Sequence, residues 1–222
     1  PPPPPSTIPR PPPIPTLRRS RRQRQMCIRD RHDDLRPARG LRVTTRINVT
    51  ATRKTRSYTP HETLTRVLWT LASPLFRLSP RPFWGWRRMM LRAFGAQIGA
   101  QVHVYPTVRI TMPWNLWIED AAAVGDRAIL YALGPITIGA RATVSQNAHL
   151  CAGTHDLKRA DRALIKAPIV IGDDAWICAD AFVGPGVKIG AGAVLGARAV
   201  AMRDLRTGAT GVGNPMREVN RK

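Results

Sequence analysis

A six-residue repeat that begins at Ile98 predicts an all-β fold in which short strands wind into a parallel β-helix. Three observations favour this class. Thirteen hexads, from the one starting at Ile98 to the one starting at Leu195, open with an aliphatic residue; the fifth position is Ala, Val or Thr in 12 of the 13; and the second position is Gly in seven. A period of six fits neither an amphipathic helix nor simple strand alternation, but it fits a short strand and a turn repeated around a three-sided coil.

Residues 1–58 are predicted to form a disordered tail rich in Pro and Arg. Ten of the 21 prolines lie in the first 15 residues, and the first 59 residues carry 15 Lys and Arg against three Asp and Glu, which is +12 of the formal charge of +21. Such a segment cannot bury enough apolar surface to offset the entropy lost on ordering. The stretch MCIRDR (26–31) also resembles translated sequencing-adaptor sequence, so no function is assigned to the tail.

Residues 59–95 are predicted to form an N-terminal helical segment. The stretch TPHE has the form of a capping box, with Thr59 as the N-cap and Glu62 reaching back to it. Leucine and valine then recur at helical spacing on one face until Ser73-Pro74, where we expect the helix to end. This face is formed by Leu64, Val67, Leu68 and Leu71.

A second helix is predicted in the stretch SPRPFWGWRRMMLRAFG (79–95), with Gly95 as its C-terminal stop. Its apolar stripe consists of Trp86, Met89, Met90, Ala93 and Phe94, and its arginines Arg87, Arg88 and Arg92 are expected elsewhere on the surface. Neither helix is long enough to span a bilayer. Packing of these helices onto the domain and contact with a membrane surface both remain open.

The coils are predicted over residues 96–206, followed by a C-terminal segment over 207–222. The aliphatic residue of each hexad faces inward, the small fifth residue lets the narrow interior close, and Gly at the second position tolerates the backbone angles of a corner. Coils stack at the ~4.8 Å spacing of parallel strands. The repeat breaks after His155 and resumes at Ile171, so we expect an excursion loop over 156–168.

The chain resembles the hexapeptide-repeat acyltransferases with a left-handed parallel β-helix, in the branch of the colanic acid biosynthesis acetyltransferases. The resemblance covers roughly residues 60–222. It lies in RPFWGWRRMMLRAFGAQIG before the coils, VSQNAHLCAGTHD, APIVIGDDAWICADAFVGPGVKIG and the terminal GVGNPMREV. The left hand of the helix is implied by this resemblance alone.

The resemblance implies a general base and a site for acetyl-CoA. His155 aligns with the family's base, which takes the proton of the acceptor hydroxyl, and neutral imidazole suits that role near pH 7. Ala179 matches the residue that contacts the thioester, next to a backbone N–H that stabilises the oxyanion. Contacts to CoA are implied for Ala197, Arg203 and Arg217. Two positions depart from the family pattern, Met202 in place of Thr and Ala132 in place of Asn.

Other roles for these residues remain open from the sequence. A histidine at a loop entrance is often only a bonded or solvated imidazole, and Cys151, four residues before His155, is a candidate nucleophile. His103, His149 and His155 are the candidate zinc ligands in the coils, but their spacing does not fit the zinc-binding relatives, and no metal is predicted. Three cysteines are too few for a disulfide framework and fit a reducing cytoplasm.

We therefore expect an O-acetyltransferase that uses acetyl-CoA as co-substrate, with no permanently bound cofactor. The acceptor is expected to be a hydroxyl of a sugar or exopolysaccharide precursor. The family implies a homotrimer in the cytoplasm, with a peripheral contact at the inner face of the membrane left open and no specific nucleic-acid partner. The alternatives are a catalytically silent scaffold and a basic membrane- or nucleic-acid-binding protein.

Overall fold

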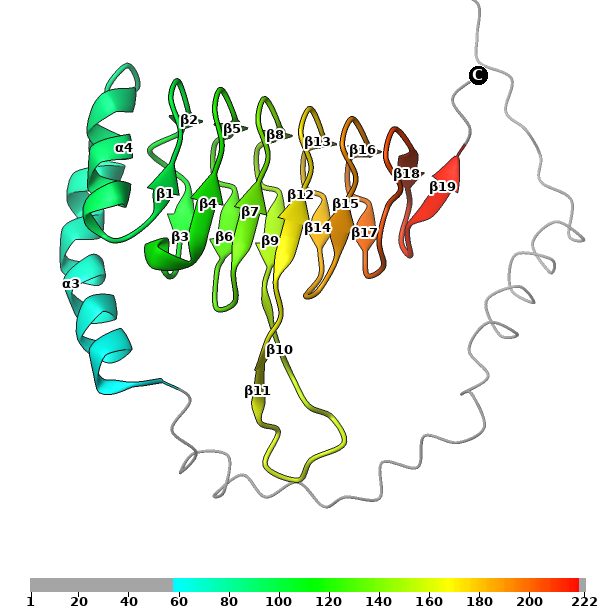
Figure 1. Cartoon of the computed structure of the whole chain (residues 1–222), viewed down its shortest axis with the longest axis horizontal. Coiled ribbons are helices and arrows are strands. Elements are labelled where there is room, and N and C mark those ends of the chain that lie inside the picture. Colours follow the sequence, from blue (N-terminus) through cyan, green and yellow to red (C-terminus); the bar gives the residue numbers. More distant parts are fainter. Residues whose placement is uncertain (1–57, 220–222) are drawn as a thin grey trace, which may run out of the picture. The chain divides into compact units, whose positions relative to one another are not determined.

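The computed structural model describes residues 58–219, so the tail predicted over residues 1–58 lies almost wholly outside this range. Helices α3 (Pro60–Arg77) and α4 (Trp84–Ala93) stand at one end of a stack of parallel coils (Figure 1). The coils make about six turns, which divide into three parallel sheets. The hairpin β10 (Gly153–His155) and β11 (Leu164–Lys166) projects away from the coils.

Each full turn adds one strand to each sheet. The first sheet contains β1 (Gln97–Ile98), β4 (Leu116–Ile118), β7 (Ile136–Ile138), β12 (Ile169–Ile171) and β15 (Lys188–Ile189). The second contains β2 (His103–Val104), β5 (Ala123–Val124), β8 (Thr143–Val144), β13 (Trp176–Ile177), β16 (Val194–Leu195), β18 (Thr210–Val212) and the antiparallel β19 (Arg217–Val219). The third contains β3 (Arg109–Ile110), β6 (Ile129–Tyr131), β9 (His149–Cys151), β14 (Phe182–Val183) and β17 (Val200–Ala201). A short 3-10 helix, Pro113–Asn115, precedes β4.

The inward-facing residues of the hexads fill the interior as predicted. Ile118 pairs with Ile138 and Ile138 with Ile171, so aliphatic side chains of successive coils stack on one another. The small fifth residues, such as Ala142 and Ala175, are also buried. One continuous apolar core therefore runs through the stack, and each coil finds its backbone partners in the coils next to it.

The glycines at the second position have a different reason from the predicted one. In the corners of the coils the left-handed backbone angle falls at the fourth position, for example Arg127 with φ 58° and Asp174 with φ 56°. Second-position glycines instead lie against the backbone of the next coil: a Cβ on Gly172 would be 2.5 Å from the nitrogen of Ala191, and one on Gly190 would be 2.3 Å from the nitrogen of Thr207. They are required for close stacking and not for a special φ.

Helix α3 begins with the predicted capping box but does not end at Ser73-Pro74. The Thr59 side chain accepts from the Glu62 N–H, and Glu62 Oε2 accepts from the Thr59 N–H at 2.8 Å. The helix continues through Pro74 to Arg77. Pro74 has no N–H for the carbonyl of Thr70, but Ser73 Oγ donates to that carbonyl at 3.0 Å, so the proline leaves no unsatisfied acceptor.

Arg87 of α4 is fully buried, whereas the sequence predicted it on the surface. Its guanidinium donates to the carbonyls of Val104, Pro80 and Arg81 and to Ser79 Oγ, at 2.5 to 2.9 Å. Burial lowers the pKa of this guanidinium from its usual value. These hydrogen bonds hold α4 and the preceding loop against the first coil. The acceptors are mostly backbone carbonyls, whose positions cannot be predicted from residue types.

The predicted apolar face of α3 does not pack against the coils. The helix is buried through Trp69 and Phe76, and Trp69 Nε1 donates to the carbonyl of Ile110 at 2.8 Å. Leu71 remains 72% exposed, and its neighbours on the same face are exposed as well. None of the helices in the described range combines the length and the hydropathy that a membrane crossing requires.

Candidate functional site

The hairpin that carries His155 begins at Gly153, three residues before the predicted start of the excursion loop. Its strands pair in antiparallel register from Gly153 opposite Lys166 to His155 opposite Leu164. Lys166 Nζ lies 3.1 Å from Glu62 Oε1, so β11 is also linked to α3. His155 is the last residue of β10, and its side chain is exposed. A reactive group at the end of a paired strand is held in place by the backbone yet stays accessible.

The tautomer of His155 follows from one hydrogen bond. Its Nδ1 lies 2.6 Å from the carbonyl oxygen of Arg162, on the opposite side of the hairpin. A carbonyl oxygen only accepts, so Nδ1 must carry the proton and donate it. In the neutral ring Nε2 then has a free lone pair and can act as a base.

The acidic groups around His155 are engaged with other partners. The Asp156 side chain accepts from the backbone N–H of Lys158 at 2.9 Å. Asp161 is bound by the Arg159 guanidinium, at 2.8 and 2.9 Å, and the hydrogen bond from that guanidinium lowers the pKa of the Asp161 carboxyl. In the described part of the hairpin, no carboxylate hydrogen-bonds the His155 ring. The hairpin carboxylates described here therefore do not orient the His155 ring; the Arg162 carbonyl does.

Ala179 and Ala197 lie on top of each other at one corner of the coil stack. Ala179 precedes β14 and Ala197 precedes β17, and the N–H of Arg198 donates to the carbonyl of Ala179 at 3.0 Å. Among residues 58–219 the N–H groups of both alanines have no hydrogen-bond acceptor. The corresponding N–H of Ala140 donates to Asp173 Oδ1, whereas those of Gln146 and Ala191 also have no acceptor among the described residues. These two N–H groups are thus free to bind a ligand.

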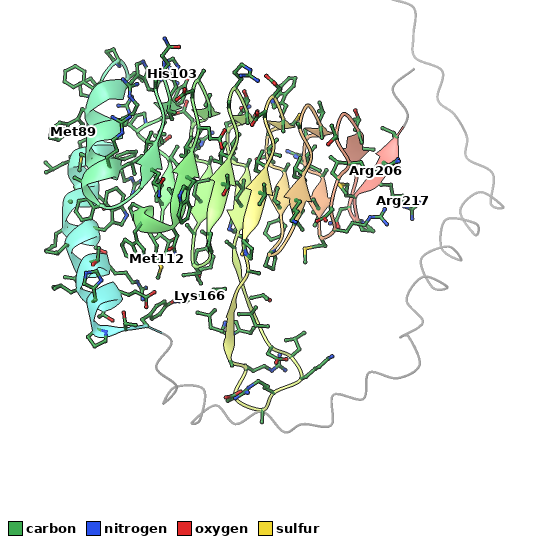
Figure 2. The ribbon with its side chains drawn as sticks, viewed as in Figure 1. Met89, His103, Met112, Lys166, Arg206 and Arg217 are labelled. Carbon is green, nitrogen blue, oxygen red and sulfur yellow. The ribbon has the colours of Figure 1, made fainter. Side chains whose placement is uncertain are left out.

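Arg203 and Arg217 both belong to the C-terminal end of the stack, where Figure 2 shows Arg217. Arg203 Nη2 donates to the carbonyl of Met216, at 3.2 Å, directly before Arg217. Both arginines are exposed, and neither forms an ion pair with a described carboxylate, whereas nearby Arg206 is bound to Glu218. Guanidinium groups without a carboxylate partner are suited to an anionic ligand such as a phosphate.

One chain does not bring all the predicted residues together. Strands of the third sheet run in the same direction, so Ala179 and Ala197 lie at their amino ends, whereas His155 follows the carboxyl end of β9 and Arg203 follows that of β17. A surface groove of about 690 Å³ on the first sheet, next to Trp117 and Glu119, is lined by none of the five predicted residues. The predicted site is therefore not a single pocket of one chain.

The remaining candidates occupy other environments. Cys151 Sγ donates to the carbonyl of Gly153 at 3.4 Å, and no bond joins it to His155. Burial raises the pKa of the Cys178 thiol, which disfavours the reactive thiolate. In the described range no three His, Cys, Asp or Glu side chains form a group suited to a metal ion. His103 stacks on Trp84 with ring centroids 4.6 Å apart.

A row of rings on the third sheet was not anticipated from the sequence. His149 is flanked edge-on by Tyr131 and Phe182, with ring centroids 6.4 and 5.2 Å away. Its Nε2 is buried without a partner, and burial lowers the pKa of the ring. The period-six repeat places these three residues at outward-facing positions of neighbouring strands, so their proximity could have been predicted from the repeat.

The two departures from the family pattern lie at the carboxyl ends of strands of this sheet. Ala132 is buried, and its carbonyl accepts from Asn115 Nδ2 at 2.8 Å. Met202 is 60% exposed beside Arg203.

Comparisons with known proteins agree with this architecture. Residues 168–200 match the family described as bacterial transferase hexapeptide (six repeats). The chain is 44% identical to the "Putative colanic acid biosynthesis acetyltransferase WcaF" of Escherichia coli (strain K12) over 147 residues, 66% of this chain and 81% of the relative.

Two solved structures illustrate the shared fold, a left-handed parallel β-helix. A galactoside acetyltransferase in complex with coenzyme A has a TM-score of 0.69 at 21% identity and covers 78% of this chain and 88% of its own. The hexapeptide-repeat acetyltransferase VCA0836 of Vibrio cholerae O1 biovar eltor, complexed with acetyl coenzyme A, has a TM-score of 0.68 at 22% identity. The match covers 74% of this chain and 91% of the Vibrio chain. The chain therefore belongs to the hexapeptide-repeat acetyltransferases, in the branch of the colanic acid biosynthesis acetyltransferases.

Proposed function

We propose that this protein transfers the acetyl group of acetyl-CoA to a hydroxyl of a sugar or exopolysaccharide precursor, with His155 as the general base. The hydrogen bond from His155 Nδ1 to the Arg162 carbonyl carries the proposal, because it leaves Nε2 as the proton acceptor. The names of the relatives support the substrates: colanic acid biosynthesis for one, galactoside and acetyl coenzyme A for others.

Transfer is direct in this mechanism. His155 Nε2 takes the proton of the acceptor hydroxyl as its oxygen attacks the thioester carbon, and a tetrahedral oxyanion forms. The carbon–sulfur bond then breaks, the oxyanion collapses to the acetyl ester, and the CoA thiolate recovers the proton from the imidazolium. No acyl-enzyme forms, so Cys151 has no covalent role.

Ala179, Ala197, Arg203 and Arg217 bind acetyl-CoA. The free N–H of Ala179 donates to the oxyanion, and the N–H of Ala197 lies one coil further along the same corner. Arg203 and Arg217 bind the phosphates of CoA through their unpaired guanidinium groups. The side chains of the two alanines matter mainly by being small.

The active protein is a homotrimer with its sites between adjacent copies. His155 and Arg203 follow carboxyl ends of strands of the third sheet and the two alanines lie at amino ends, so the acetyl-CoA between two copies meets His155 and Arg203 of one copy and the alanines of the other. The projecting hairpin has the reach for this contact (Figure 1). Closed rotational symmetry gives each copy one such site.

An acceptor screen tests the function. Labelled acetyl-CoA is incubated with the protein and a panel of free sugars, nucleotide sugars and oligosaccharides, and ester formation is measured by mass spectrometry. We expect base-labile O-acetyl groups on at least one acceptor. Absence of turnover across the panel, together with salt-sensitive binding of the protein to nucleic acid, would instead favour a non-catalytic binding protein.

A further inference from the structure

We propose that the outer side of α3 and α4 docks this protein on the surface of an anionic phospholipid bilayer. The docking surface, here called the cap face, is formed by the exposed apolar side chains Leu64, Leu68, Leu71, Leu75, Trp86 and Met89. Trp86 Nε1 donates to the carbonyl of Leu75, at 3.3 Å, and joins the two helices into one surface. Figure 2 shows Met89 on the side of α4 that points away from the coils.

Exposed apolar side chains are concentrated at this end of the chain. Of the 16 large apolar side chains exposed in the described range, nine lie between Leu64 and Met89. Single exposed leucines are ordinary on a protein surface, but a contiguous apolar patch marks a surface that is covered by a partner. α3 packs on the coils through Trp69 and Phe76, so the leucines of the cap face add nothing to that packing.

The charge around the cap face is mostly positive, and Glu62, at the start of α3, is bound to Lys166. Residues 63–118 contain seven arginines and no Asp, Glu or Lys, a net charge of +7. Arg87 is buried and Arg81 is paired with Asp126, whereas the other five arginines have no ion-pair partner among the described residues. Two of these five, Arg88 and Arg92, donate to carbonyls of the first coil. The surface therefore combines apolar side chains with excess positive charge, the combination that binds helices to anionic lipid headgroups.

This combination favours a bilayer over the other occupants. A second copy of this face would bring two arginine-bearing surfaces together, and residues 1–57 are themselves strongly basic, so charge opposes both. Nucleic acid would satisfy the arginines through its phosphates but offers nothing to a row of exposed leucines. A bilayer with anionic headgroups satisfies both, with α3 lying in the plane of the interface.

The test is flotation of the full-length protein with vesicles. Vesicles of phosphatidylcholine alone are compared with vesicles that also contain phosphatidylglycerol, at low and at high salt. We expect binding only to the anionic vesicles, weakened by salt because the arginines lose part of their attraction. The double variant Leu71→Asn/Leu75→Asn should lower the partition coefficient by about tenfold or more, since two apolar anchors are removed without a change of charge.

Two variants serve as controls. Leu157→Asn/Ile165→Asn removes two exposed apolar side chains from the hairpin and should leave vesicle binding unchanged. Met89→Asn probes the same surface from α4 and should weaken binding, so the result does not depend on the fold of one α3 variant. Circular dichroism and size-exclusion chromatography establish that each variant is folded.

Three results would overturn the proposal. These are equal binding of wild type and Leu71→Asn/Leu75→Asn to anionic vesicles, equal binding to neutral and anionic vesicles, and a change in oligomeric state of that variant without any change in vesicle binding. The last result would assign the cap face to a second copy. Acetyl transfer is measured separately, so failure of the docking proposal leaves the enzymatic one untouched.

Discussion

Replacement of His155 by alanine is the most direct test of the proposed chemistry. A positioned general base contributes about 10²- to 10⁴-fold to a rate, equivalent to about 2.7 to 5.5 kcal/mol of transition-state stabilisation. Two carboxylates of the hairpin are engaged elsewhere, Asp156 with the N–H of Lys158 and Asp161 with Arg159. Neither carboxylate hydrogen-bonds the His155 ring or stands in its place, so we expect kcat of His155→Ala to fall within this range.

The assay measures CoA release by chromatography with the identified acceptor, and acetyl-CoA binding by calorimetry. Binding of acetyl-CoA should survive in His155→Ala, because the proposed contacts to CoA come from other residues. His149→Ala is the matched control: His149 lies between Tyr131 and Phe182, and it should retain far more activity than His155→Ala if the coils still fold. A folded His155→Ala protein with the wild-type rate would show that His155 is not the base.

Three further predictions follow from the geometry. Arg217→Ala should raise the KM for acetyl-CoA by about tenfold with a smaller effect on kcat, because a ground-state charge contact is lost. Arg206 is paired with Glu218, so the control Arg206→Ala should leave KM unchanged. Equal KM values for Arg217→Ala and wild type would reject the phosphate contact. Arg87→Met should lower the free energy of unfolding in urea by about 3 kcal/mol or more, because four acceptors in one buried and three partly buried hydrogen bonds lose their donor. Arg88→Met removes a single bond to Val102 and should cost less; similar losses would contradict this account. Finally, hydrogen bonds from the Thr59 backbone and then from Lys166 lower the pKa of Glu62. The stabilisation of the fold by ionised Glu62 is therefore complete above the ordinary carboxyl pKa of 4.5 and is lost as the pH falls below it. The difference in Tm between wild type and Glu62→Gln should be present at neutral pH and vanish in acid, and a difference that persists in acid would argue against the linkage.

The coils could be predicted from the sequence because their rule is local. In each hexad the first and fifth residues face inward, and this rule predicts the burial of Ile138 and Ala142. The capping box at Thr59 is local too. The continuation of α3 through Pro74 also depends on neighbouring residues, because Ser73 Oγ donates to the Thr70 carbonyl. The sequence does not show which oxygen the Ser73 hydroxyl bonds, so this continuation was not predicted.

Features that depend on distant backbone groups could not be predicted. The acceptors of Arg87 are mostly main-chain carbonyls, which have no signature in residue type. The same holds for the carbonyl of Arg162, which sets the tautomer of His155. His155 itself was singled out by the family resemblance, because one histidine at a loop entrance has no pattern of its own; the roles of the five site residues remain predictions.

The stacking of coils also bears on how the chain opens. Each coil exchanges backbone bonds only with its immediate neighbours, so local unfolding starts at the ends of the stack and proceeds coil by coil. The amide protons of β7 and β8, in the middle, should exchange with solvent far more slowly than those around β17 and β18. Arg203 and Arg217 belong to that last, fraying part of the chain. A ligand that binds both arginines therefore stabilises the folded state of the last coils, so it slows their local unfolding and the unfolding of the coils next to them.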